Sequence, residues 1–472
     1  MKHARQMSVW GTVLVLAFMA AVGSPAARGA TEQAKQQAID DGLAYLAATQ
    51  ATSGSEGYWS YANDGTLAAT ASAALAFIEE GYLPGDGSVY GNGVVDKACN
   101  YIFNRATADG RFTSIGAGGM ETAGYTRYAE DYNNNGLLDD GGNNQGVYFN
   151  PGNAGRNVYT TGIVAPVVYA LGEALGSNTA VGKGSLTSGM TYKQVMQDVA
   201  DWFSWAQVEP NRGVYRGGWQ YDANSSTSDN STAQWGALPI LYAQAWGLSV
   251  PDYVKNELNL WADYIQERDA GANYGGSGYT NESLYTNVSK TGGLMLEFAA
   301  IGDAANDPWA EAARQFINGR WNNGPNNIWY GNKGHPYAMW AAYKALEVYG
   351  FTAMNDNGTP GDTSDDFLIG YGMSNAPGGI TIGQDWGTQT SAAGDWYSDY
   401  CDWLVNSQLP GGDWAQLIGS NYWYGPLQAG WYINILNAAG APPPIIPEPV
   451  TAMGLLLGVG CLARYVRRRK SR

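Results

Sequence analysis

Few cysteines and few positive charges are present, and each shortage excludes a class of protein. Three cysteines in 472 residues are too few for a fold held together by disulfides. Residues 31–446 contain 17 lysines and arginines against 41 aspartates and glutamates, a formal net charge of −24. Such a surface repels nucleic acid and anionic membranes, so we expect no nucleic-acid partner. It suits a soluble extracellular protein or one that collects divalent cations.

Residues 1–30 predict a signal peptide. Lys2 and Arg5 precede an apolar run over 9–22, and small residues follow that run. A basic start, an apolar stretch and small residues, in this order, are typical of secretory signals. A transmembrane anchor is the alternative, but the run is short for a span. We therefore expect an exported protein that is cleaved between Ala26 and Ala30.

The C-terminal end contains a second candidate targeting signal. Residues 441–449 form a proline-rich linker that contains Pro447, Glu448 and Pro449. Residues 450–472 continue with an apolar run of fourteen residues and a tail with six arginines and lysines. A helix of that length spans about 21 Å, which is short against a ~30 Å hydrocarbon core. The basic tail favours the cytoplasmic side of a membrane.

This end resembles a PEP-CTERM sorting signal of Gram-negative bacteria in its Pro-Glu-Pro motif, its apolar run and its arginine-rich tail. The resemblance implies an exosortase-type processing enzyme as a partner and transient membrane anchoring through residues 450–472. It also implies removal of the tail and delivery to the outer surface or the extracellular polysaccharide matrix. An ordinary tail anchor is the alternative.

Between these ends, residues 31–440 alternate amphipathic stretches with more apolar ones. Apolar residues at helical spacing, with glycine or proline beyond them, predict a helix for each stretch. The amphipathic stretches are 38–50, 94–105, 192–207, 254–266, 309–318 and 400–408. The more apolar stretches are 66–78, 160–175, 230–246, 287–301, 335–349 and 424–439. Six such pairs predict an all-α fold, an (α/α)6 toroid of six helical hairpins in two concentric rings, with the apolar helices inside.

A short sequence motif, which we call the glutamine phrase, ends several amphipathic stretches. It consists of a glutamine, a glycine-containing turn and a tryptophan. We expect the glutamine to bond carbonyls at its helix end, the glycine to permit the turn, and the tryptophan to fill the gap between hairpins. The copies are Gln50…Gly57-x-Trp59, Gln207…Gly218-Trp219 and Gln408…Gly412-x-Trp414. They resemble the QW-type repeat of squalene-hopene cyclases and protein prenyltransferases, whose inner helices the apolar segments 71–77 and 232–238 also resemble. The resemblance implies an α/α toroid with any ligand site in the mouth, where the inner helices begin.

The catalytic motifs of related toroids are missing. A cyclase of this kind would protonate its substrate with an Asp-x-Asp-Asp motif, and no such motif is present. The acidic run Asp362-Thr-Ser-Asp365-Asp366 lies in a glycine- and proline-rich loop and not at the start of an inner helix. A prenyltransferase would hold zinc with Asp, Cys and His, but Cys99 and Cys401 fall on amphipathic helices rather than at the mouth. The Gly-Cys-Gly-Glu-Gln motif of toroidal thioester domains is also absent. Whether the protein is an enzyme therefore stays open.

Polar residues gather at the expected starts of the inner helices. The candidate ligand-binding residues are Asp229, Asn230, Lys290, His335 and Tyr337. Pro336 at the first helical position makes His335 a helix N-cap candidate. His335 and Tyr337 are also weak catalytic candidates, because a His–Tyr pair can transfer protons in a polysaccharide lyase. A hydrogen-bonded structural histidine is the alternative.

Two connections, 106–158 and 351–395, are longer than ordinary loops and are treated as insertions. In the first, Asp131, Asn133, Asn135 and Asp139 match the start of a calcium loop, with glycine at its sixth position. The glutamate expected at position 12 is replaced by glycine. Calcium is therefore the candidate cofactor, and a polar turn is the alternative.

The 18 tryptophans and 32 tyrosines can stack on sugars or fill the core. With the export signals, they favour a cell-surface or exopolysaccharide-matrix protein that is non-catalytic or binds glycan, with extracellular polysaccharide as a partner. A polysaccharide lyase or glycoside hydrolase acting in the toroid mouth is the alternative.

The calcium assignment is testable by thermal melting. Calcium bound only by the folded chain at 100 times its dissociation constant should add about 2.7 kcal/mol to the free energy of unfolding. Adding a chelator should therefore lower the melting temperature of the protein. An unchanged melting curve would count against a calcium loop at Asp131.

Overall fold

In the computed structural model the chain is mostly helical, which confirms the all-α prediction. The short strands form three antiparallel pairs: β1 (Ala51–Ser53) with β2 (Glu56–Tyr58), β3 (Ala106–Ala108) with β4 (Val147–Phe149), and β5 (Met354–Asn355) with β6 (Phe367–Leu368). The described residues are 30–62, 65–109, 146–152, 156–304, 307–321, 328–349, 354–355, 367–368, 396–417 and 423–438. The expected signal peptide and the sorting motif at Pro447, Glu448 and Pro449 lie outside these ranges.

Every stretch predicted to be helical contains a helix. The amphipathic helices are α1 (Glu32–Thr49), α3 (Asp96–Phe103), α6 (Tyr192–Ala206), α8 (Asp252–Ile265), α10 (Pro308–Asn318) and α12 (Trp396–Ser407). The more apolar helices are α2 (Thr66–Glu79), α5 (Asn157–Leu175), α7 (Asn230–Ala245), α9 (Val288–Ile301), α11 (Pro336–Val348) and α13 (Pro426–Leu436). Helix α1 begins six residues earlier than expected because Thr31 caps it, its hydroxyl accepting from the Ala34 N–H at 3.1 Å.

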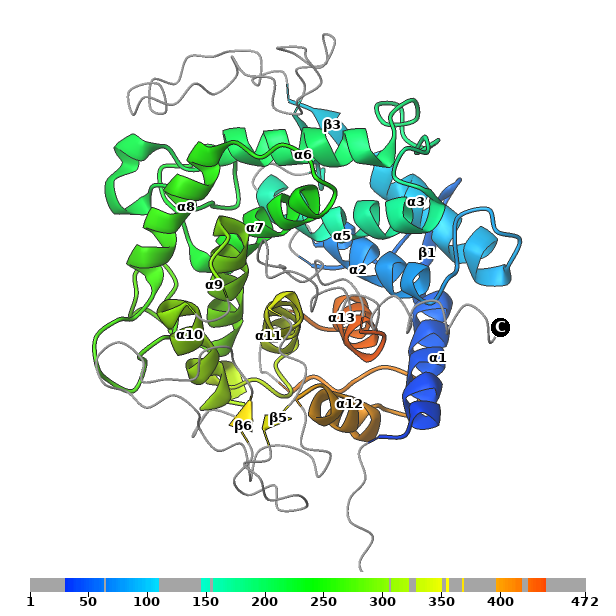
Figure 1. Cartoon of the computed structure of the whole chain (residues 1–472). Helices are drawn as coiled ribbons and strands as arrows, with labels where there is room; N and C mark the ends of the chain where they lie inside the picture. The colour runs from blue at the N-terminus through cyan, green and yellow to red at the C-terminus, as the bar shows by residue number, and fades with distance from the viewer. Residues whose placement is uncertain are drawn as a thin grey trace, which may run out of the picture.

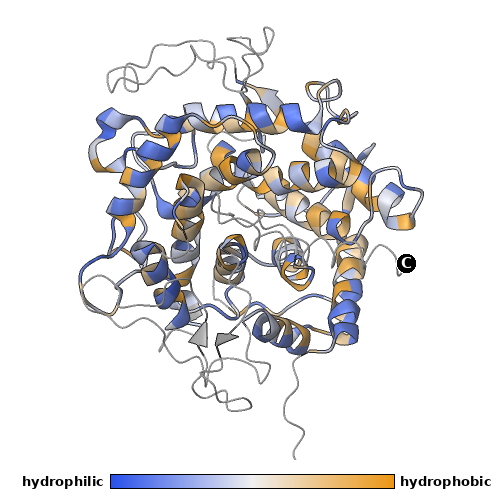
Figure 2. Cartoon of the chain, viewed as in Figure 1, coloured by the Kyte–Doolittle hydropathy of each residue, from blue (hydrophilic) through white to orange (hydrophobic). Residues whose placement is uncertain are grey.

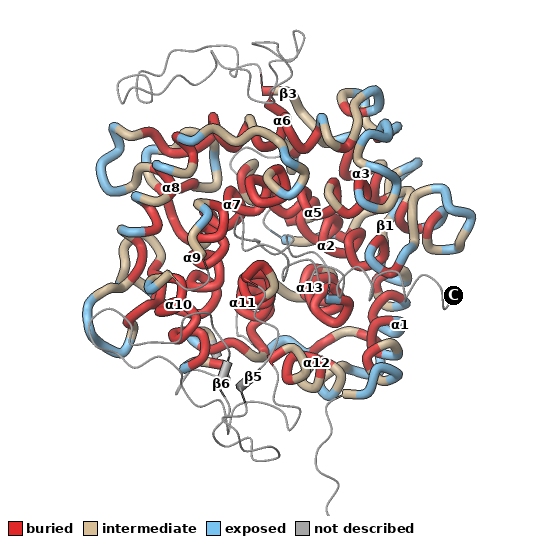
Figure 3. The backbone as a smooth tube through the Cα atoms, in the orientation of Figure 1, coloured by how far each residue is buried: buried red, intermediate tan, exposed pale blue. Residues whose placement is uncertain are grey.

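The apolar helices contact one another in a closed order. Helix α2 packs on α5, α5 on α7, α7 on α9, α9 on α11, α11 on α13, and α13 returns to α2 (Figure 1). These helices are buried along most of their length (Figure 3) and more apolar than the helices around them (Figure 2). By length and composition α5 could cross a membrane, but 72% of its apolar window is buried inside the protein. That burial is typical of a core helix.

Glycines let neighbouring apolar helices approach closely. A Cβ added at Gly292 in α9 would lie 2.6 Å from the Ala341 carbonyl carbon in α11. One added at Gly430 in α13 would lie 2.7 Å from the Ser72 carbonyl carbon in α2. Real Cβ atoms do not come this close to backbone, so these two helix pairs depend on glycine.

The glutamine after an amphipathic helix bonds the next amphipathic helix as well as its own turn. Gln207 Nε2 donates to Gly217 O at 2.7 Å and to Val254 O, in the first turn of α8, at 3.0 Å. Gln266 Nε2 reaches Trp309 O in α10 at 2.9 Å, and Gln50 Nε2 reaches Val94 O, just before α3, at 3.0 Å. This side chain therefore bonds carbonyls of its own turn and also links its helix to the next amphipathic helix, which the sequence did not predict.

The last copy of this phrase closes the circuit of helices. Gln408 Nε2, after α12, donates to Ala38 O in α1 at 2.8 Å, across 370 residues of sequence. Gly412 has φ +86°, and a Cβ there would lie 2.7 Å from the Asp41 carbonyl carbon of α1. The turn after the last amphipathic helix is thus fitted against the first one.

The tryptophan of each copy bonds the helix that precedes it. Trp59, Trp219 and Trp414 donate through Nε1 to Leu46 O, Phe203 O and Leu404 O at 2.8, 3.0 and 2.9 Å. Each acceptor lies four residues before the glutamine, so its carbonyl belongs to the last helical turn. The buried indole N–H therefore fastens each turn to the last helical turn before it, in addition to the ring filling space.

The remaining two junctions use charged groups. Trp202 Nε1 in α6 donates to Asp109 at 3.1 Å, beyond the end of β3. Trp321 Nε1 and Lys333 Nζ both donate to Asp399 in α12, at 2.5 and 2.7 Å. These contacts link α3 to α6 and α10 to α12 where no glutamine phrase was recognised in the sequence.

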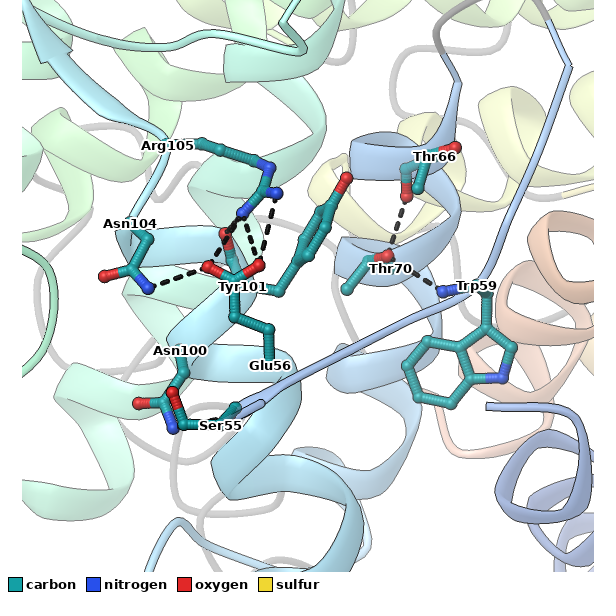
Figure 4. Close-up of polar contacts among 9 residues, drawn as sticks. All are labelled: Ser55, Glu56, Trp59, Thr66, Thr70, Asn100, Tyr101, Asn104 and Arg105. Carbon is teal, nitrogen blue, oxygen red and sulfur yellow. Dashed lines mark hydrogen bonds and ion pairs between the residues drawn. The ribbon is translucent and has the colours of Figure 1, made fainter. Parts of the chain in front are cut away.

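The first hairpin is fastened to two helices by polar contacts (Figure 4). Glu56 in β2 pairs with Arg105 after α3 at 3.2 Å, and Asn104 Nδ2 donates to the same carboxylate at 2.8 Å. On the other side, the Trp59 N–H donates to the Thr70 hydroxyl in α2 at 3.2 Å. The turn between α1 and α2 is therefore held against α3 as well as α2.

Replacing Gly412 by alanine should destabilise the protein more than replacing Gly87. Both glycines have φ +86°, so both variants place a Cβ in left-handed backbone, but only Gly412 faces another helix, because no atom lies within 4 Å of a Cβ at Gly87. We expect a loss of roughly 2–4 kcal/mol for Gly412→Ala and about 1 kcal/mol for Gly87→Ala. Urea unfolding measures both, and equal losses would contradict a tight fit of the turn on α1.

Candidate functional site

The sequence-predicted polar residues lie where the apolar helices begin. Asp229 is the N-cap of α7, and its Oδ1 accepts from the Thr232 N–H at 3.0 Å. His335 is the N-cap of α11, as predicted, with Nδ1 accepting from the Ala338 N–H at 3.3 Å. Lys290 lies in the first turn of α9. Because α7 packs on α9 and α9 on α11, these starts are neighbours.

His335 is fully buried against two tryptophans whose ring centroids are 5.4 Å apart. Its ring centroid lies 5.5 Å from that of Trp329 and 5.1 Å from that of Trp423. Because Nδ1 accepts a hydrogen bond, the proton of the neutral ring must lie on Nε2. That Nε2 has no hydrogen-bond partner in the described part of the chain. Burial, and then the nearby Lys290, lowers the pKa of His335 to about 3, so the ring is neutral at physiological pH.

Lys290 is a buried amine without a partner. Its side chain is 4% exposed, and its Nζ makes no hydrogen bond or ion pair within the described ranges. Burial lowers the pKa of Lys290 to about 7, an effect that the charge of Asp229 opposes. The amine is therefore close to half protonated at neutral pH.

Asp229, whose charge acts on this amine, has one oxygen without a partner in the described structure. Its Oδ1 also accepts from the hydroxyls of Ser231 at 2.5 Å and Thr232 at 3.1 Å, whereas Oδ2 has no partner in the described structure. Burial raises the pKa of this carboxyl above its ordinary value, although the hydrogen bonds from Ser231 and Thr232 oppose that shift. Tyr221 and Tyr279 lie near the same carboxylate, whose charge adds to burial in raising their pKa values.

Tyr337 is held by hydrogen bonds and by stacking. Its hydroxyl donates to Ser231 O and accepts from Gln234 Nε2 at 2.6 Å. Its ring stacks on Trp423 at 5.6 Å and on Trp235 at 6.0 Å. Burial raises the pKa of Tyr337 well above its usual range. The hydroxyl proton is thus engaged with the backbone, which does not fit the proton-transfer role considered for this residue.

Asn230 connects helices rather than facing the other polar groups. Its Nδ2 donates to Ser277 Oγ at 2.7 Å and to Lys290 O at 3.2 Å. Its Oδ1 accepts from Trp261 Nε1 of α8 at 3.0 Å. The amide is therefore saturated by structural contacts, and its part in ligand binding is the least supported of the predicted set.

Aromatic side chains that sequence reasoning did not single out surround the polar group. Trp329 and Trp423 lie against His335, Tyr221 and Tyr279 lie near Asp229, and Tyr159 of α5 packs edge-on against Trp235 at 5.6 Å. These five rings (Tyr159, Tyr221, Tyr279, Trp329 and Trp423) are partly exposed. We call these five rings the aromatic rim. Most of them lie in connections between helices, where no periodic pattern marks a functional side chain.

Below the rim, the centre of the apolar helices is filled. Trp431 of α13 stacks on Trp235 of α7 at 6.4 Å and on Trp340 of α11 at 6.5 Å. Lys344 is fully buried there, with Nζ 4.4 Å from the centroid of Trp235. Burial lowers the pKa of Lys344 well below 10.5 and raises that of Glu297, on α9, well above 4.5. Burial therefore disfavours the charged form of both groups.

The predicted calcium ligands Asp131, Asn133, Asn135 and Asp139 lie outside the described residues. Among the residues that are described, no group of three or more His, Cys, Asp or Glu side chains could hold a metal ion. The calcium prediction therefore stays a prediction.

Comparisons with known proteins assign no relative. No protein-family model matches the chain, and neither a curated protein nor a solved structure matches it.

The buried amine of Lys290 predicts a pH-dependent stability. With a folded pKa of about 7 against 10.5, the unfolded chain binds more protons than the folded chain between these pH values. The contribution of this group to stability therefore rises with pH in that window. Lys290→Met removes the unfavourable buried charge, so its stability advantage over wild type should shrink by about 1.4 kcal/mol per pH unit above pH 7.5.

Urea unfolding at pH 7.5, 8.5 and 9.5 measures this difference. Lys255→Met, on the outer helix α8, is the matched control for loss of one lysine. A difference between Lys290→Met and wild type that stays constant over these pH values would contradict a depressed pKa.

Proposed function

We propose that the helices form an (α/α)6 toroid of the terpenoid cyclase and protein prenyltransferase kind. The closed order of contacts among α2, α5, α7, α9, α11 and α13 supports the inner ring. The bond from Gln408 after α12 to Ala38 in α1 supports closure of the outer ring. The catalytic motifs of that family are missing from the sequence, so the proposal concerns the scaffold and not the chemistry of those enzymes.

We further propose that the protein is exported and sorted by its C-terminal signal. The basic and apolar start, and the Pro447-Glu448-Pro449 motif with its arginine-rich tail, support this. In this proposal an exosortase-type enzyme processes the chain, which is tethered to the membrane before that step. The destination is the outer surface or extracellular matrix of a Gram-negative bacterium.

At that destination the protein binds glycan at the start of its inner helices. The observation that carries this proposal is the aromatic rim around polar groups without partners. Sugars present apolar faces that stack on aromatic rings and hydroxyls that need both donors and acceptors. Asp229 Oδ2 offers an acceptor, and His335 Nε2 and Lys290 Nζ offer donors.

A polysaccharide lyase or glycoside hydrolase is the second candidate. The observation in its favour is that Lys290 has a pKa of about 7 beside a carboxyl whose pKa is raised, since groups tuned toward neutrality serve acid–base chemistry. Lys290 would then replace Tyr337 as the proton-transfer residue. Release of unsaturated sugar ends that is abolished by Lys290→Met would establish this activity.

Glycan binding can be measured on an array of neutral and acidic polysaccharides with the full chain. Trp423→Ala should weaken any binding about tenfold or more, because it removes a ring of the rim, and a lost stacking partner is worth roughly 1.4 kcal/mol. Trp403→Ala on α12, a partly exposed tryptophan outside the rim, is the matched control. Absence of binding to every glycan on the array would overturn the proposal.

A further inference from the structure

We propose that this site selects acidic sugars, with the carboxylate of a uronic acid residue held between Lys290 Nζ and His335 Nε2. This inference rests on the proposed glycan-binding function and adds the chemical class of its ligand.

Two buried donors without acceptors carry the inference. The His335 ring must carry its proton on Nε2, because Nδ1 accepts from the Ala338 N–H. That Nε2–H is fully buried and has no partner in the described chain. Lys290 Nζ is buried nearby, close enough for its charge to act on the His335 ring. Two adjacent unpaired donors lack an acceptor that bears negative charge, and a carboxylate has two oxygens to offer.

The described part of the chain does not supply that acceptor. Asp229 is the nearest carboxylate that acts on Lys290, but it forms no ion pair with the amine. Its Oδ1 is taken by the N-cap of α7 and by two hydroxyls. Burial also favours its neutral form. Among the described residues the Lys290 ammonium therefore has no ion-pair partner, and an acidic ligand would provide one.

The helix starts add a favourable field. Helices α7, α9 and α11 have 16, 14 and 13 residues, and their N-termini lie together at this end of the fold. The partial positive charge at each N-terminus attracts an anion. The formal charge of −24 on residues 31–446 acts against a polyanion at long range. Salt screens that repulsion beyond about 8 Å under physiological conditions, whereas contacts inside a buried site are screened much less.

The aromatic rim supplies the rest of a sugar site. Trp329 and Trp423 both lie against the His335 ring and 5.4 Å from each other, between ring centroids, so a carboxylate at Nε2 would bring the sugar ring beside this pair of rings. Asp229 Oδ2, which has no partner among the described residues, can accept from a sugar hydroxyl. The carboxylate of a uronate thus meets the donors of Lys290 and His335, a hydroxyl meets Asp229 Oδ2, and the apolar ring face meets the aromatic rim.

Binding should draw a proton onto the protein. The titratable and charged groups around Lys290 are Asp229 at the start of α7, His335 and Tyr337 on α11, Tyr221 and Tyr279 in the connections, and Arg156 before α5. The pKa of His335 is about 3 and those of these three tyrosines are raised, whereas the pKa of Lys290 is about 7, so Lys290 is the amine that titrates near neutrality. An anion beside it favours the ammonium form, so affinity for the acid should fall as pH rises above 7.

The experiment compares tetragalacturonate with its neutral methyl ester by calorimetry, using the full-length chain in mild detergent. We expect the acid to bind about 10- to 100-fold more tightly, the range expected for charge-assisted hydrogen bonds. Calorimetry at pH 7.5 in two buffers of different ionisation enthalpy should reveal proton uptake. Lys290→Met should remove both the preference and the uptake.

Two further variants separate the site from general charge effects. His335→Asn keeps an acceptor for the Ala338 N–H, and so keeps the helix cap, but loses the Nε2 donor, so it should reduce the preference for the acid. Lys255→Met on α8 removes one positive charge elsewhere and should leave the preference intact.

The outcomes distinguish the two proposals. Equal affinity for the acid and its ester would overturn the acidic-sugar inference and leave glycan binding standing. A preference that Lys255→Met abolishes as completely as Lys290→Met would overturn the assigned site. Binding of neither ligand, together with an empty glycan array, would overturn both proposals.

Discussion

The fit of the turn after α12 against α1 is the contact on which the rest of the structure depends. Gln408 and Gly412 meet Ala38 and Asp41 across about 370 residues. Closing a loop of that length costs on the order of 5 kcal/mol of chain entropy, and each doubling of length adds little more. The closed circuit then gives every apolar helix two apolar neighbours, whereas an open stack would expose a face of α2 and of α13. Hydrogen bonds from α13 to α2, such as Asn434 Nδ2 to Ser72 O at 3.2 Å, depend on the same closure.

Closure also determines where chemistry can occur. The starts of α7, α9 and α11 lie together because α7 packs on α9 and α9 on α11, although Asp229 and His335 are far apart in sequence. Helix starts need side-chain acceptors for their free N–H groups, which is why polar residues gather there. The same requirement explains why a polar residue at a helix start is weak evidence of function. What separates a site from a cap is the atom left over after capping, such as His335 Nε2 or Asp229 Oδ2.

The sequence predicts the helices well because their signals are local. Periodicity placed a helix in each expected stretch, and Pro336 after His335 predicted the N-cap that the structure has. The partners of side chains could not be predicted, because they belong to other helices. The glutamine of the repeated phrase was expected at its own helix end, yet it also reaches the next helix. Asn230 and Tyr337 were grouped with Lys290, but their polar atoms are engaged by Trp261, Gln234 and the backbone. The aromatic rim was missed because its residues lie mostly in connections without a pattern.

Two buried lysines show how the surroundings decide between packing and binding. Lys344 and Lys290 both lie on apolar helices, and burial lowers the pKa of both amines. Lys344 lies deep in the core with its Nζ against the faces of Trp235 and Trp340, at 4.4 and 5.4 Å, so packing accounts for its position. Lys290 instead lies at the end where the helices start, beside a second unpaired donor and under partly exposed rings. Two neighbouring donors that lack an acceptor are more costly than one. For this reason the ligand site that we propose lies at the helix starts and not among the apolar side chains at the centre of these helices.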